Sequence, residues 1–436
     1  MKRLRRASLF FGALAACVSL PARAHAQEAT GADAGGADDA VKIETWGLVR
    51  LGLSSWNGYL LGPATPVGNE DVALVRALAD LKATWPEGPE LHVQMAYHEQ
   101  IGRRVPIPAD HSSFDIQLAS LDLPIGDNTK LRIGRQQIYF GSRRIFALRD
   151  GANISRAYDG VLVDHEDGPL HLRAFAVRPV KLGPDPFDDV GDENFDVLGA
   201  HATVSFDEGR GIDLYALDYS RERSVYPQGL GPPAVGPERR YSVGARVFDT
   251  RAPFDWNIEL TRQWGEFAGD EIDAHMIAAE AGVTLADAPG APRIALKGII
   301  TTGDSDPNDD RLETFNAYFS GLYELGHISI FAPLNYIDLE PSVRFELAPR
   351  VSLLLRGTWQ WREEEADAIY IGGPFAVPAA PLGQYVARQL DVEFDFNATE
   401  SLRVHLGYSH VHVGRSVRAQ GGEPLDHFAM MLVQRF

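Results

Sequence analysis

Six arginines lie close together between residues 132 and 156 of the sequence. A guanidinium stays positively charged and can bind carboxylates and phosphates through two parallel hydrogen bonds. Such a cluster could therefore bind a phosphate group, bind nucleic acid or line a pore that passes anions. The six residues are Arg132, Arg135, Arg143, Arg144, Arg149 and Arg156.

The charge of the whole chain narrows these three possibilities. The sequence holds 41 basic and 60 acidic residues, which gives a net charge of −19. Proteins that bind nucleic acid normally carry a basic footprint, so this composition argues against nucleic acid as a partner. The usual phosphate site needs a strand, a glycine-rich loop and a helix in succession, and the stretch does not read that way. An anion-lined pore is the possibility that remains.

The first 26 residues read as a secretory signal peptide. A basic start at Lys2 to Arg6 precedes a short apolar core, and Ala24-His25-Ala26 fits the small-x-small cleavage rule. The apolar core is shorter than the roughly 20 residues that a transmembrane helix needs. Cys17 follows a sequence that resembles a lipoprotein box. We favour cleavage after Ala26 over lipidation, because the apolar core continues past Cys17 towards that site.

Cleavage there would remove five basic residues and the only cysteine. The mature chain would then carry 36 basic and 60 acidic residues, a net charge of −24. Without cysteine it could form neither a disulfide nor a thiolate metal site. Residues 27–40 are small and acidic and read as a flexible leader. Residues 41–436 are therefore the folded part.

Apolar and polar residues alternate with a period of two along almost the whole mature chain. Between residues 351 and 361, for example, apolar side chains occupy the odd positions and most polar ones the even positions. This period is typical of β-strands with one apolar and one polar face. Turn signals separate the runs, and short connections alternate with long polar ones. Eighteen strands are predicted, at about 41–54, 71–85, 89–100, 112–123, 129–140, 157–165, 169–180, 195–206, 211–222, 239–249, 253–264, 272–285, 292–302, 334–346, 350–362, 384–396, 401–413 and 425–436.

Two all-β folds could accommodate eighteen such strands. A soluble β-propeller or pair of sandwiches would bury its apolar face, but propeller blades would repeat a motif every 40 to 50 residues or so, and no such repeat is visible. A transmembrane antiparallel β-barrel of the bacterial outer membrane needs an apolar face towards lipid and a polar lumen, and a water-filled lumen would accommodate the ionised residues of the polar face. The terminal Phe436 ends an alternating strand, as in an outer-membrane assembly signal. Several tryptophans fall near predicted strand ends, where an aromatic girdle is expected: Trp46, Trp85, Trp264, Trp359 and Trp361.

The arginine-rich stretch resembles the core motif of the alginate-export family of outer-membrane porins. The matching pieces are Gly134-Arg135-Gln136, the turn from Gly141 to Arg144, residues 149–153, Tyr158-Asp159-Gly160-Val161 and Arg178-Pro179-Val180. Residues 303–315, a strand that starts near Asn335 and the terminal QRF are also similar, so the resemblance covers about residues 41–436. Tyr158 stands where the family more often has Phe. The resemblance implies an eighteen-stranded barrel and leaves the substrate open.

We therefore expect an outer-membrane channel for passive passage of an anionic, alginate-like polysaccharide or related anionic solutes, without a cofactor. The expected partners are the solute, outer-membrane lipid and, possible but open, periplasmic export proteins. The alternatives are a general or small-solute diffusion porin, a structural or adhesin barrel, and an outer-membrane hydrolase. The hydrolase is least favoured, because the sequence has no G-x-S-x-G or H-E-x-x-H motif.

The motif and the strand parity together give the candidate lumen residues. For any single arginine outside the motif, pairing with a carboxylate on a neighbouring strand is the favoured reading. Inside the motif the arginines outnumber the acidic residues, so there we favour contact with solute. The candidates are Arg135, Arg144, Arg149, Asp150, Asn153, Arg156 and Asp159 from the motif, and Arg50, Arg76, Arg246, Arg356 and Arg403 from strand parity.

One acidic segment could bind a metal. The sequence GDSDPNDD offers Asp304, Asp306, Asn308 and Asp310 as oxygen ligands for Ca²⁺. It lacks the glycine and the distant glutamate of an EF-hand loop. An acidic surface loop is therefore the favoured interpretation, and no metal is predicted.

Overall fold

The computed structural model describes residues 40–59, 68–104, 108–149, 151–227, 232–321, 327–328, 330–371, 376–377 and 382–436. The predicted signal peptide, all but the last residue of the predicted leader, and Asp150 lie outside these ranges.

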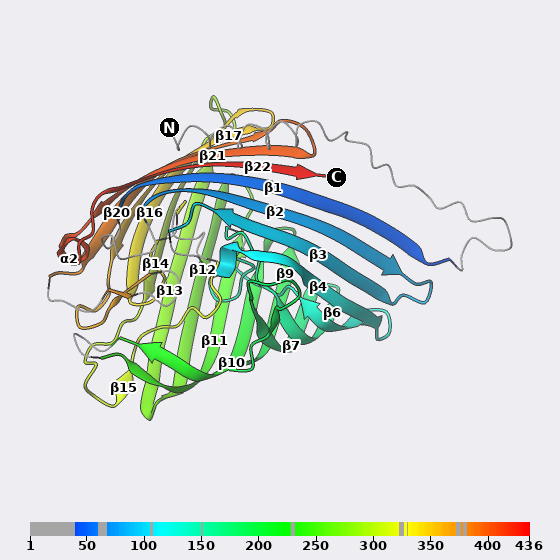
Figure 1. Cartoon of the computed structure of the whole chain (residues 1–436), viewed down its shortest axis with the longest axis horizontal. Helices are drawn as coiled ribbons and strands as arrows, with labels where there is room; N and C mark the ends of the chain where they lie inside the picture. The colour runs from blue at the N-terminus through cyan, green and yellow to red at the C-terminus, as the bar shows by residue number, and fades with distance from the viewer. Residues whose placement is uncertain are drawn as a thin grey trace.

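The described residues form a closed antiparallel barrel of eighteen strands. Each strand pairs with its neighbours in chain order, and the first pairs with the last (Figure 1). The strands are β1 (Lys42–Tyr59), β2 (Gly68–Thr84), β3 (Glu90–Ile101), β4 (Ser112–Pro124), β5 (Thr129–Gln136), β6 (Tyr158–Asp167), β7 (Leu170–Lys181), β9 (Phe195–Asp207), β10 (Arg210–Tyr226), β11 (Ala234–Asp249), β12 (Phe254–Phe267), β13 (Asp270–Thr284), β14 (Arg293–Thr301), β16 (Tyr336–Ala348), β17 (Val351–Trp361), β20 (Tyr385–Asn397), β21 (Leu402–Val413) and β22 (Leu425–Arg435).

The sequence prediction of the fold is confirmed, because all eighteen predicted strands occur in the predicted order. Strand boundaries differ from the prediction by up to five residues, at the end of β1 and the start of β11, and β5 ends at Gln136 and not near residue 140. After Gln136 the chain leaves the hydrogen-bonded ladder, and the side chains of Ile138 and Phe140 are buried against other elements of the fold. Alternation alone could not show this, because apolar residues also suit a strand.

Alternation sets the two faces of the barrel wall. On β12, Phe254 and Leu260 are 68% and 51% exposed on the outer face, whereas Glu259 and Gln263 are only 2% and 0% exposed. The outer, apolar face suits lipid, and the polar face turns inward. Exposed tryptophans lie at both ends of the wall, with Trp46 and Trp85 near one rim and Trp264 near the other.

The last strand closes the barrel at the rim where the chain ends. The backbone N–H of Gly47 donates to the carbonyl of Phe436 at 2.9 Å, and the N–H of Phe436 donates back to Gly47 at 3.1 Å. The aromatic ring of Phe436 lies where a Cβ on Gly47 would be. The terminal phenylalanine is thus part of the seam between β1 and β22.

Most of the short turns lie at this same rim, and the long connections lie at the opposite one, together with the short turn between β12 and β13. Short elements occur in the long connections: the 3₁₀ turn Pro108–Asp110, β8 (Val190–Gly191), β15 (Arg311–Leu312), β18 (Ile369–Tyr370), β19 (Ala376–Val377) and α2 (Arg415–Ala419). Among the described residues, no helix is long and apolar enough to cross a membrane.

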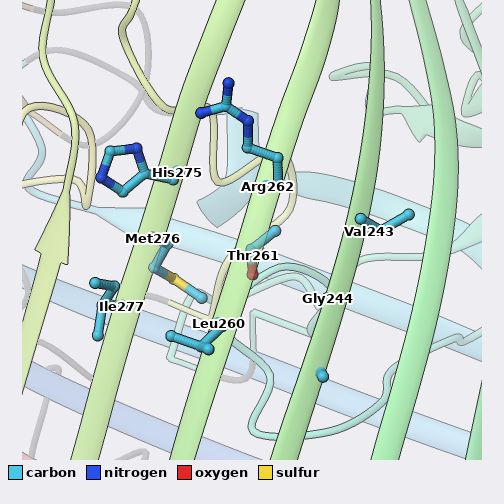
Figure 2. A pocket seen from close by; sticks show the side chains of 9 residues that line it. Val243, Gly244, Leu260, Thr261, Arg262, His275, Met276 and Ile277 are labelled. Carbon is cyan, nitrogen blue, oxygen red and sulfur yellow. The ribbon is translucent and has the colours of Figure 1, made fainter.

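A shallow groove of about 470 Å³ lies on the outer wall, across β11, β12 and β13. Figure 2 shows Arg262 and His275 at its upper end, with Leu260 and Ile277 below them. These four side chains share the outward parity of Val243, and Arg262 pairs with Asp273. The groove therefore faces lipid and is separate from the bore.

Candidate functional site: the inner loop across the bore

Residues 137–149 and 151–157, from the connection between β5 and β6, form an inner loop that crosses the barrel. The loop carries its own apolar residues: Phe140 stacks on Phe146 at 5.5 Å between ring centroids, and both pack near Phe175 of β7. Left-handed backbone at Gly141, Arg143 and Arg149 lets the chain reverse direction. A polar connection would stay in water, whereas this one gains stability by burying its aromatic rings.

One side of the inner loop is attached to β12. Arg144 is buried and donates to Glu259 at 2.9 Å and to Asn257 at 3.1 Å. The hydroxyl of Ser142 also donates to Glu259, and Tyr215 of β10 donates to the same carboxylate at 3.0 Å. Glu259 therefore acts as the anchor for this side of the loop.

The other side of the inner loop is attached to β1 and β2, which lie almost diametrically across the barrel from β12. Arg50 donates to the carbonyl of Ala152 at 2.6 Å, and Arg76 donates to the same carbonyl at 2.7 Å and to that of Asn153 at 2.6 Å. Asn153 is fully buried and donates its amide to the carbonyls of Val75 and of Asp110, each at 2.9 Å. Contacts on two facing walls show that the loop spans the bore.

Arg149 and Arg156 flank the tip of the inner loop, which is closed by a 2.7 Å bond from the N–H of Arg156 to the carbonyl of Leu148. Arg149 makes one long bond, 3.4 Å, to the carbonyl of Ile154. Arg156 donates to the carbonyls of Ala147 and Phe319 and lies over the Phe319 ring. Among the described residues, neither guanidinium has a carboxylate partner in hydrogen-bond or ion-pair contact.

Burial and the nearby positive charge of Arg156 lower the pKa of Arg149 to about 10. Arg149 remains charged at neutral pH, because that pKa is still about three units above 7. Two partly buried guanidiniums that repel each other form a place where an incoming anion would be stabilised.

A second inner segment, residues 312–321, packs against the inner loop. Phe146 and Phe319 form a parallel backbone bridge, and their rings meet edge to face at 5.1 Å. On its other side Arg240 of β11 donates to the carbonyl of Thr314 at 3.0 Å, and Gln263 of β12 donates to that of Asn316 at 2.8 Å. The sequence analysis placed this segment in a long loop and did not predict its inward course.

Arg135 and Asp159 differ from the rest of the motif. Arg135 donates to Asp159 at 2.8 Å and to the carbonyls of Ile116 and Asp189 at 3.0 Å each. The register places both residues on the face of Ile133, which is exposed on the outside. This corrects the expectation that Arg135 and Asp159 face the lumen, because side chains alternate strictly between faces along β5 and β6.

The other candidate arginines lie on the strands and pair with carboxylates. Arg246 donates to Asp213 at 2.8 Å, and Arg403 donates to Asp395 at 2.8 Å. Arg356 lies among Glu340, Asp391 and Glu393. These contacts fit the interpretation that such residues stiffen the wall. Asp150 falls outside the described residues.

The acidic segment 303–310 does not gather its side chains around one point. The carboxylate of Asp306 accepts from the N–H and the amide of Asn308, at 3.1 and 3.2 Å, and so serves its own turn. Asp304 is buried beside Asp367, whose carboxylate accepts its N–H at 3.1 Å. Among the described histidine and carboxylate groups that lie within 4.8 Å of two others, none comes from this segment.

A small polar cavity of about 160 Å³ lies between the inner loop and the wall of β2 to β4. Gln117 crosses towards it and donates to the carbonyl of Ser155 at 2.9 Å. One guanidinium and the side-chain amides of three glutamines line this cavity beside the inner loop. Its lining residues are Arg76, Leu78, Gln94, His98, Gln117, Gln137 and Ser155.

Solved structures of outer-membrane channels have this same fold. OccK5 (OpdH) of Pseudomonas aeruginosa matches with a TM-score of 0.62 and 10% identity, over 90% of this chain and 98% of that one. OccK2 (OpdF) of the same organism, solved in complex with glucuronate, matches with a TM-score of 0.60 and 11% identity over the same shares. OpdK, solved with vanillate, has a TM-score of 0.59 and 11% identity, again over 90% and 98%. No curated protein matches the sequence.

The family comparison is more direct. The model of the alginate export family matches residues 68–430, which include both inner segments and seventeen of the eighteen strands in whole or in part. With the barrel, its apolar outer face and the loop across its bore, the match identifies an outer-membrane channel, and the chain belongs to the alginate export family.

Proposed function

We propose that the barrel passes an anionic carbohydrate, such as an alginate-like polyuronate chain, by diffusion past Arg149 and Arg156. The observation that carries this proposal is the pair of guanidiniums at the tip of the inner loop, bonded to carbonyl oxygens. A carboxylate entering the narrow bore loses part of its hydration, and a nearby guanidinium offsets that cost.

Two structures of the same fold that were solved with ligands support the same chemistry. Glucuronate and vanillate, which occupy OccK2 and OpdK, both carry a carboxylate. Alginate is itself built from uronates. A second candidate solute is a small monomeric carboxylate, because the inner loop and the second inner segment both narrow the bore.

Planar-bilayer recording on the refolded protein tests the proposal. We expect a reversal potential that shows anion selectivity, and a reversible block of the current by uronate oligomers. Block by glucuronate alone would favour the small-carboxylate candidate. Cation selectivity with no block by any acidic sugar would contradict the proposal.

A matched pair of variants tests the role of the inner loop. Arg149→Gln removes the positive charge at the loop tip and should lower the anion-to-cation permeability ratio severalfold. Arg210→Gln removes the same charge from an exposed residue at the start of β10 that pairs with Asp207, and it should leave the ratio unchanged. Equal effects of the two substitutions would show that the loop tip does not set selectivity.

A further inference from the structure

We propose that His327, Glu393 and His405 bind one divalent transition-metal ion, such as Zn²⁺, on the inner wall of the barrel. One ligand atom from each of these residues lies within 4.8 Å of the other two. Two imidazoles and a carboxylate form a ligand set that first-row transition metals use with an open position for water. This inference is independent of which solute the channel passes.

The strands place two of the three ligands by register. Glu393 of β20 lies opposite Gly407 of β21, and Asp395 lies opposite His405. Side chains two residues apart on one strand share a face, so Glu393 and Asp395 point the same way, as do His405 and Gly407. The sheet therefore presents a carboxylate and an imidazole side by side on the inner face.

His327 comes to this site from the long connection between β14 and β16. Its backbone N–H donates to Asp391 at 3.0 Å, which fixes the residue against β20. Its imidazole lies over Gly407, and a Cβ on that glycine would be 2.1 Å from Nε2. Glycine at position 407 thus leaves the space that the ring fills.

The distances suit a shared ion better than direct contacts. His327 Nδ1 is 3.6 Å from Glu393 Oε2, longer than a good hydrogen bond. Two ligands of a tetrahedral ion, each about 2.0–2.1 Å from the metal, are about 3.3 Å apart. Small side-chain movements would therefore bring these two atoms into position.

The surrounding groups prepare the ligands for a metal. Nδ1 of His405 lies 3.2 Å from the carboxylate of Asp395, and donation to that carboxylate leaves Nε2 as a lone-pair donor. Such a carboxylate–histidine pair is the usual support of a metal-bound imidazole. Arg356 donates to Oε1 of Glu393 and leaves Oε2 on the side of His327. The ring of His427 lies 5.7 Å from that of His327. Its Nδ1 is buried and has no hydrogen-bond partner among the described residues, so His427 is a candidate fourth ligand.

Metal titration of the refolded full-length mature chain tests the site. ZnCl₂ binding is measured by calorimetry, and CoCl₂ is used in parallel because tetrahedral Co²⁺ with imidazole ligands absorbs visible light. We expect one tight site, weakened at least tenfold in His327→Gln and in His405→Gln. Asp395→Asn should weaken binding by about 10- to 100-fold, the range found for such supporting carboxylates.

Two histidine variants are matched controls. His410→Gln alters the same strand but on the outer face, where His410 pairs with Asp426 at 2.9 Å. His171→Gln alters the other histidine-containing group of possible ligands, with Asp164 and Glu166. Both should bind one Zn²⁺ as tightly as the original chain. A boiled-against-unboiled detergent gel checks that every variant forms the barrel.

Three outcomes would overturn the proposal. The original chain could fail to bind Zn²⁺ and Co²⁺ tightly, the His327 and His405 variants could bind as well as the original, or His171→Gln alone could abolish binding. Gly407→Ala gives a further check, because its methyl group would displace the His327 ring and should weaken binding while every proposed ligand is kept.

Discussion

Arg50 and Arg76 show how single side chains hold the inner loop in place. The register sets them directly opposite each other on β1 and β2, an arrangement that is unfavourable for two like charges. Arg50 donates to the carbonyl of Ala152 and to the side-chain oxygen of Asn153, and Arg76 donates to the backbone carbonyls of both residues. Arg76 binds two successive carbonyls at once, through Nε and Nη2. This use depends on the fixed fork of a guanidinium, which an ammonium group lacks.

Arg76→Lys should therefore loosen the loop without changing the charge of the bore. Hydrogen bonds to charged groups contribute about 1.5–3 kcal/mol each, so losing one of the two should raise the population of undocked loop severalfold or more. Single-channel recordings should show more frequent conductance fluctuations, with unchanged ion selectivity. Arg210→Lys, at the exposed start of β10, is the control. A steady current in Arg76→Lys would mean that the fork is not what holds the loop.

At the scale of elements, the strands could be predicted from sequence and the inward segments only in part. Alternation of apolar and polar residues with a period of two marks the two faces of the barrel wall. The strands, and the inward direction of the Arg50 and Arg76 side chains, could therefore be predicted from it. The course of a loop depends on distant contacts. Phe146 meets Phe319, 173 positions away in the sequence, and neither position shows that pairing by itself. The inward course of residues 312–321 and the place of His327 beside β20 and β21 were not predictable for this reason.

The contact between the two inner segments should control how wide the bore is. Phe319→Ala removes a mostly buried ring, and truncation of a buried phenylalanine typically costs about 3–5 kcal/mol. We expect a larger single-channel conductance, because the second segment loses its hold on the inner loop. Phe146→Ala should have a similar effect, and the double variant should add little to either one. Phe254→Ala, on the lipid face, should leave the conductance unchanged.

At the scale of the whole molecule, the charge of the chain and the charge of its proposed gate have opposite signs. The full sequence carries −19, while Arg149 and Arg156 lie at the tip of the inner loop. Exposed charges act over about 8–10 Å at physiological salt, and over about 3 Å at 1 M. Charges in a narrow, partly dehydrated bore are screened much less. The local pair should therefore outweigh the distant acidic surface.

This difference in range gives a test that separates the gate from the surface. Asp306 and Asp309 are exposed acidic residues of the segment 303–310, and the double variant Asp306→Asn, Asp309→Asn removes two negative charges there. At 0.1 M KCl we expect a small shift towards anions, since the surface field still reaches the mouth of the channel. At 1 M KCl that shift should vanish, whereas Arg149→Gln should still lower the anion preference. Reversal potentials across a tenfold KCl gradient, set around each mean concentration, measure both effects. A surface effect that persists at 1 M, or an Arg149 effect that disappears there, would show that selectivity arises at the mouth and not at the inner loop.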